Sequence, residues 1–175
     1  LHVVGNPFYE NLNNFSPMET YEEFDIYFTL ERDRKTILFI SDSISEQNGG
    51  YQKSIEKYGF NEITVFQSVL QKMVHLSLKN KINLKDYTLI IKLHPKENRT
   101  KYDDILRDSQ FKKSFILDSS KFSNHDLIYH SDFHIGMFSS MVLESIIIGK
   151  KVLRVEINNI AGDLINIDKK YFKYK

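Results

Sequence analysis

Three short polar segments carry the side chains best suited to holding an anionic ligand. One is Gly136-Met137-Phe138-Ser139-Ser140, which joins an apolar run to a segment of helical spacing. If a helix begins there, unpaired backbone N–H groups and the positive end of the helix dipole face outward, and two hydroxyls add donors. That combination is a cradle for phosphate, so we predict phosphate contacts at Phe138, Ser139 and Ser140. The alternative is a serine that only caps the helix.

A second segment, His94-Pro95-Lys96, ends another apolar run. Because the residue before a proline is held extended, we expect the His94 side chain at the end of a strand. An imidazolium there could neutralise charge on a departing phosphate, whereas a neutral ring could donate one hydrogen bond. Lys96 would add a mobile positive charge. We predict His94 as the catalytic residue and Lys96 as a phosphate contact; the alternative for His94 is a purely structural role.

Two further candidates are weaker in isolation. Residues 42–50 form a polar loop ending in two glycines, which could close over a ligand, and Ser43 is its predicted contact. Glu144 lies one helical turn beyond Ser140 on the same face, where a carboxylate could accept hydrogen bonds from ribose hydroxyls. The alternatives are an ordinary surface loop and a solvated or ion-paired glutamate.

Several other chemistries lack the residues they need. The chain has 175 residues, no cysteine and a net charge of +1, so disulfides, thiolate sites and a strongly basic nucleic-acid surface are not expected. It also lacks a D-x-D pair, a P-loop, a G-x-G-x-x-G loop and a G-x-S-x-G elbow. His130 and His134 straddle a helix end and a strand, so we predict no metal and no cofactor. No run approaches the roughly 18 apolar residues of a membrane span.

Alternating strands and helices must position these candidates. Continuous apolar runs predict buried strands, and apolar spacing of three and four predicts helices. The strands are expected at 36–41, 88–93, 114–117, 132–136 and 151–155, and the helices at 62–79, 102–107, 124–129 and 139–148, with Gly149 ending the last helix. This alternation predicts one Rossmann-like, three-layer α/β domain over residues 36–175, with a parallel sheet of order 3-2-1-4-5, after an irregular linker over residues 1–35.

Open parallel sheets bind ligands beyond the carboxyl ends of their strands, where the strand order reverses. In the predicted order, the first, second and fourth strands are neighbours. The three polar segments follow these same strands, so we expect them to meet at one edge of the sheet.

Together these segments resemble a known enzyme superfamily. Ile91-Lys92-Leu93-His94-Pro95-Lys96-Glu97, His130-Ser131-Asp132, the run from Gly136 to Glu144, and Gly149-Lys150-Lys151-Val152 resemble the carboxyl-terminal half of GT-B glycosyltransferases that build bacterial surface polysaccharides. Bacterial sialyl- and polysialyltransferases and CDP-glycerol glycerophosphotransferases are similar. The resemblance covers residues 86–155 and extends weakly to Val3-Val4-Gly5-Asn6-Pro7, which resembles the link between two GT-B halves.

The resemblance implies a nucleotide-activated donor, linked to CMP, CDP or UDP, as substrate. His94 would contact its phosphate, Ser139 and Ser140 would bind it, and Glu144 would approach the ribose, with no metal. The catalytic base would lie in an amino-terminal acceptor-binding domain or another polysaccharide-assembly protein as partner. We therefore expect a cytoplasmic location, peripheral to the inner membrane, in capsule or lipooligosaccharide synthesis. The leading expectation is a sialyltransferase-like donor domain. The alternatives are a CDP-glycerol glycerophosphotransferase-like or UDP-GlcNAc 2-epimerase-like enzyme domain and a non-catalytic binding or assembly module.

Overall fold

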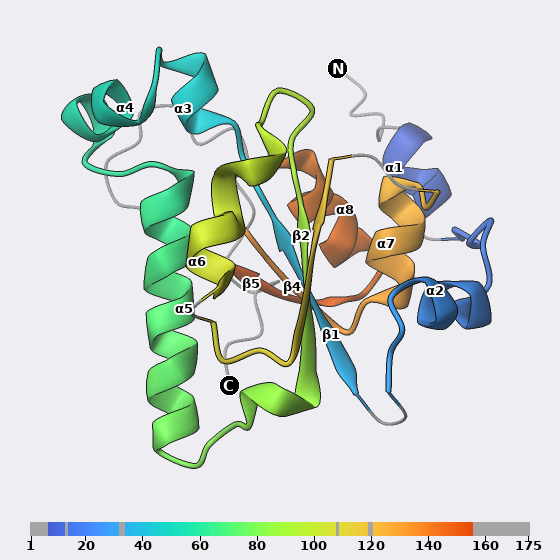
Figure 1. The fold of residues 1–175 in the computed structure, drawn as a ribbon. Coiled ribbons are helices and arrows are strands. Elements are labelled where there is room, and N and C mark those ends of the chain that lie inside the picture. The colour runs from blue at the N-terminus through green and yellow to red at the C-terminus, as the bar shows by residue number, and fades with distance from the viewer. Residues whose placement is uncertain (1–6, 13, 32–33, 108, 119–120, 156–175) are drawn as a thin grey trace.

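A five-stranded, all-parallel sheet forms the centre of the protein (Figure 1). The structure is a computed structural model that describes residues 7–12, 14–31, 34–107, 109–118 and 121–155. The strands are β1 (Lys35–Ile40), β2 (Tyr87–Lys92), β3 (Lys113–Leu117), β4 (Phe133–Gly136) and β5 (Lys151–Arg154). Their spatial order is β3-β2-β1-β4-β5, which confirms the predicted order and the Rossmann-like α/β class.

Both faces of the sheet are covered at its centre, which explains why β1 and β2 are nearly continuous apolar runs. Side chains alternate along β1, so that Ile37 and Phe39 face one core and Leu38 and Ile40 face the other. Helices α5 (Glu62–Leu78) and α6 (Asp103–Arg107) cover the first face, and α7 (Asn124–His130) and α8 (Ser140–Ile147) cover the second (Figure 1).

Several short elements lie outside this predicted frame. They are α1 (Pro7–Leu12), α2 (Tyr21–Tyr27), α3 (Ile44–Gln47), α4 (Tyr51–Tyr58) and two 3-10 turns, Leu84–Asp86 and Arg99–Tyr102. The prediction that residues 1–35 are irregular is therefore wrong over α1 and α2, and the loop predicted at 42–50 contains α3. The apolar side chain of Phe24, on α2, is fully buried in the core beside α7 and α8, and this burial holds α2 against the domain.

The packing of α8 against the sheet depends on one residue without a side chain. A Cβ at Gly136 would lie 2.6 Å from Cγ2 of Val142 and 3.3 Å from Cβ of Ile40. Glycine therefore allows the end of β4, the first turns of α8 and the end of β1 to approach closely. Gly149 ends α8 with a φ of 85°, as its sequence position predicts.

Within the described ranges, no helix combines the length and the apolar character that crossing a membrane requires.

Candidate functional site

Hydrogen bonds join the three predicted segments where β1, β2 and β4 end, and we call this region the switch edge. It consists of Ser41 and Asp42 after β1, His94 to Glu97 after β2, and Met137 to Ser140 between β4 and α8. Ser41 Oγ donates to Glu97 Oε1 over 2.7 Å. The amide of Phe138 donates to Asp42 Oδ2 over 3.3 Å. The convergence expected from the sheet order is therefore present in the structure.

Asp42 brings an acidic group to the predicted phosphate cradle. Burial raises the pKa of Asp42 to about 6, and the charges of Glu97 and Glu62 add to this effect, while the amides of Phe138 and Met137 oppose it. The Phe138 amide, predicted to be open to a ligand, donates to this carboxyl group instead. At neutral pH the carboxylate lies where a bound phosphate would experience its repulsion.

The start of α8 keeps two hydroxyls at the switch edge. Ser139 is the N-cap residue, and its Oγ accepts a hydrogen bond of 3.4 Å from the amide of Met141. Ser139 therefore caps α8, as the alternative to phosphate binding proposed, and its oxygen keeps a further lone pair. Ser140, the first residue of α8, is exposed and accessible to a ligand. Ser139 can therefore cap the helix while the hydroxyls of both serines donate to an anion.

The turn after β2 fixes the orientation of His94. The Glu97 amide donates to the His94 carbonyl over 2.9 Å, and the His94 amide donates to Glu97 Oε2 over 2.7 Å. The Lys96 amide donates to His94 Nδ1 over 3.2 Å. His94 is partly buried and the Lys96 side chain is exposed at the same turn.

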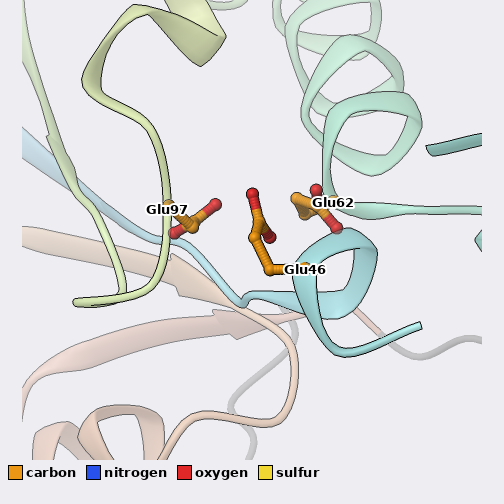
Figure 2. Close-up of side chains that lie close together, drawn as sticks. All are labelled: Glu46, Glu62 and Glu97. Atoms are coloured by element: carbon orange, nitrogen blue, oxygen red, sulfur yellow. The ribbon is translucent and has the colours of Figure 1, made fainter. Parts of the chain in front are cut away.

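A buried ionic cluster lies beneath this turn. Figure 2 shows the carboxylates of Glu46, Glu62 and Glu97 pointing toward one another from α3, the start of α5 and the turn after β2. Lys101 Nζ lies 2.9, 2.5 and 2.8 Å from them, respectively. Burial works to lower the pKa of Lys101, but Glu62, Glu97 and Glu46 together raise it, so the ammonium stays charged.

Three converging carboxylates could suggest a metal site, yet the cluster already has its cation. The side chains of Lys101, Glu62 and Glu97 are fully buried, and Lys101 Nζ occupies the space between the carboxylates. Among the described residues these are the acidic groups close enough to share an ion. The cluster therefore behaves as a structural ion-pair network that connects α3, α5 and the His94 turn.

Two predicted contacts are engaged inside the protein. Glu144 is buried, and its Oε2 lies 3.2 Å from Nε2 of His125 on α7. The rings of Phe8 and Phe15 lie against that histidine, with centroid distances of 5.9 and 5.3 Å. Ser43 is fully buried and its Oγ accepts a hydrogen bond from Gln47 within α3. These contacts support structural roles for both residues.

His130 and His134 have different surroundings. His130 Nε2 is 2.8 Å from the carbonyl of Glu19. His134, on β4, is fully buried, and burial lowers its pKa to about 3, with a further contribution from the charge of Lys150. Neither histidine belongs to the switch edge.

Sequence reasoning missed three residues that shape the site: Asp42 as an acid, Glu97 and Lys101. Glu97 stands three residues after His94, the spacing at which an acidic side chain returns to a backbone amide, so a local signal existed. For Lys101 the four-residue spacing from Glu97 was a local signal, but Glu46 and Glu62 lie far from it in the chain.

Comparison with known proteins gives little beyond the fold. No protein-family model matches this chain, and no curated protein is similar enough to count as a relative. Among solved structures, the chain is similar to Thermosulfurimonas dismutans KpsC, a beta Kdo 2,4 transferase, with a TM-score of 0.43 and 16% identity over 85% of this chain. The alignment covers 49% of that protein, so this chain spans about half its length. At such values the likeness assigns neither a family nor an activity.

Proposed function

We propose that this chain is the donor-binding domain of a metal-independent, sialyltransferase-like glycosyltransferase of bacterial surface-polysaccharide synthesis, one half of a GT-B fold. The observation that carries the proposal is the joining of the ends of β1, β2 and β4 into one site. Glu97 binds Ser41 on one side, and Asp42 binds the Phe138 amide on the other. Parallel sheets bind phosphate-bearing ligands at this position.

The chemistry of the site suits a leaving phosphate. Transfer would be displacement at the activated carbon of the donor, so negative charge develops on the departing phosphate. His94, Ser139 and Ser140 offer hydrogen-bond donors to that charge, and the start of α8 adds its dipole. Lys96 adds an exposed positive charge nearby. In this proposal the acceptor and the catalytic base belong to a partner domain, and the Glu144 contact to ribose would require opening of its pair with His125.

A ligand-dependent stability measurement tests this function directly. Thermal unfolding of the chain would be followed with CMP, CDP, UDP, GDP and inorganic phosphate in parallel. A ligand at one hundred times its Kd adds about 2.7 kcal/mol of stability, which corresponds to an upward shift of roughly 5 to 10 °C for a domain of this size. We expect a shift that depends on the base and is lost in His94→Ala and in Ser139→Ala/Ser140→Ala.

Matched controls separate the site from general effects. His75→Ala and Ser68→Ala replace a histidine and a serine on α5, away from the switch edge, and should keep the full ligand response. Absence of any shift with all five ligands would contradict an autonomous donor site. Stable association with a polysaccharide-assembly protein would then favour the non-catalytic module, and epimerisation of a UDP-sugar would favour the epimerase-like enzyme.

A further inference from the structure

The hydrogen bond to His94 Nδ1 determines which ring nitrogen carries the proton. A backbone amide can only donate, so the contact of 3.2 Å from the Lys96 amide requires an unprotonated Nδ1. The proton of the neutral ring is then on Nε2. A doubly protonated ring would place two N–H groups against each other at this contact. Of the two roles open to His94, the structure therefore favours the neutral ring that donates one hydrogen bond.

Glu97 is the residue that maintains this arrangement. Its Oε2 accepts from the His94 amide at 2.7 Å, and its Oε1 accepts from Ser41 Oγ at 2.7 Å and from Lys101 Nζ at 2.8 Å. The side chain is fully buried, so these bonds are shielded from water. Both carboxylate oxygens are therefore occupied in holding the turn that presents the imidazole.

The ion pair with Lys101 holds this carboxylate in place. Because Lys101 also pairs with Glu46 and Glu62, its ammonium is fixed from three directions and offers the buried Glu97 carboxylate a cation in a fixed position. Ser41 fixes the other side of the same oxygen, and its Oγ also contacts the Tyr102 hydroxyl at 2.5 Å. The backbone of His94 is thus anchored both to β1 and to the start of α5.

We propose that Glu97 is a positioning residue that holds His94 as a neutral Nε2–H donor toward the donor phosphate, with Lys101 as its counter-ion. Glu97 does not touch the substrate; it acts by fixing the His94 backbone so that the Lys96 amide meets Nδ1. This inference rests on the proposed function for its ligand, whereas the state of the ring can be measured without one.

The first measurement is the tautomer of His94 in the ligand-free chain, by long-range ¹H–¹⁵N NMR, with His94→Ala to assign the signals. We expect the Nε2–H form in the wild type and in Lys96→Ala, because the donor to Nδ1 is a backbone amide. Glu97→Ala should give a mixture of tautomers. Glu97→Asp keeps the charge beside Lys101, so this variant should fold, but its shorter side chain withdraws the carboxylate from the His94 amide. It should therefore also give a mixture of tautomers.

The second measurement is nucleotide affinity, with the nucleotide that gives the largest thermal shift. Glu97→Asp should weaken nucleotide binding roughly tenfold, which is the effect of one lost hydrogen bond. A mixed or Nδ1–H ring in the wild type, or a Glu97→Asp chain with wild-type tautomer, overturns the positioning role whether or not nucleotide binds. The expected tautomers without nucleotide binding would instead refute the proposed function alone.

Discussion

The amide of Phe138 donates a hydrogen bond of 3.3 Å to Oδ2 of Asp42, so an acidic residue that follows β1 occupies part of the helix start that a phosphate would use. A carboxylate and a phosphate compete for the same kind of donor. The protonation of Asp42 therefore bears directly on ligand binding. Because burial raises the pKa of Asp42 to about 6, this group changes charge near neutral pH.

We expect Asp42→Asn to strengthen nucleotide binding above pH 6. Asparagine keeps an oxygen for the Phe138 amide but removes the negative charge, so affinity at pH 8 should rise roughly tenfold relative to the wild type. At pH 5, where Asp42 is protonated, the two proteins should bind alike. Titration calorimetry at both pH values measures the difference, and comparing proteins at equal pH cancels the titration of the phosphate itself.

The same substitution has a ligand-free consequence for stability. The folded-state pKa of Asp42 is above its ordinary value of 3.8, so the fold binds a proton more tightly than the unfolded chain does. The stabilisation it contributes is present at low pH and is lost as pH rises through about 6. Asp42→Asn should therefore be more stable than the wild type at pH 8, by about 3 kcal/mol in urea unfolding, and not at pH 4. Equal stability at both pH values would contradict the raised pKa.

His134 should make the fold sensitive to acid. Its folded-state pKa is lowered from 6.5 to about 3, so the unfolded chain binds the proton more tightly in this range. Stability should fall by about 1.4 kcal/mol per pH unit as pH decreases from 6.5 toward 3. In His134→Leu this component should disappear from a series of urea unfolding curves. His75→Gln, at an exposed position on α5, is the matched control and should keep the wild-type slope.

Gly136→Ala should destabilise the domain by about 1 to 3 kcal/mol, because the new Cβ would overlap Cγ2 of Val142. Val142→Ala removes that Cγ2 and leaves a cavity of its own. In the double variant the overlap is gone, so the loss of unfolding free energy should be smaller than the sum of the two single losses. Simple additivity in urea unfolding would show that the close approach of β4 and α8 does not limit this position.

Lys101→Met should lower the free energy of unfolding by about 3 to 5 kcal/mol, since it leaves three carboxylates close together without a cation. Lys101→Arg keeps the charge and should lose less. Chemical unfolding of the two variants tests this, and equal losses in the methionine and arginine variants would show that charge is not the cause.

The sheet could be predicted from sequence because its signal is local and repeated. The central strands β1 and β2 are short apolar runs, and burial of both faces of β1 explains why Ile37, Leu38, Phe39 and Ile40 show no polar alternation. Parallel strands joined by helices can be arranged in few spatial orders, so the strand order could be predicted once the strands and helices were located. Helix α2 could have been found from its capping box, in which Thr20 and Glu23 bond reciprocally.

The details of the site were less predictable, because they depend on distant parts of the chain. Serine at a helix start signals both a cap and an anion contact, and only the geometry of Ser139 shows that it caps α8. The pairing of Glu144 with His125 depends on how α7 and α8 pack together. The pair of Lys101 with Glu97 has the i,i+4 spacing of a local ion pair, but its partners on α3 and α5 lie far away in the chain and follow no spacing rule.

Ser41 and Asp42 are consecutive residues that bond to loops following the two neighbours of β1: Ser41 bonds to Glu97 and Tyr102 after β2, and Asp42 bonds to the loop before α8, after β4. Alternation along an extended chain assigns each side chain to its side. A single-residue insertion or deletion between Ile40 and Asp42 would exchange the two assignments and disconnect both loops at once. The length of the chain at this dipeptide is therefore a constraint for any redesign of the site.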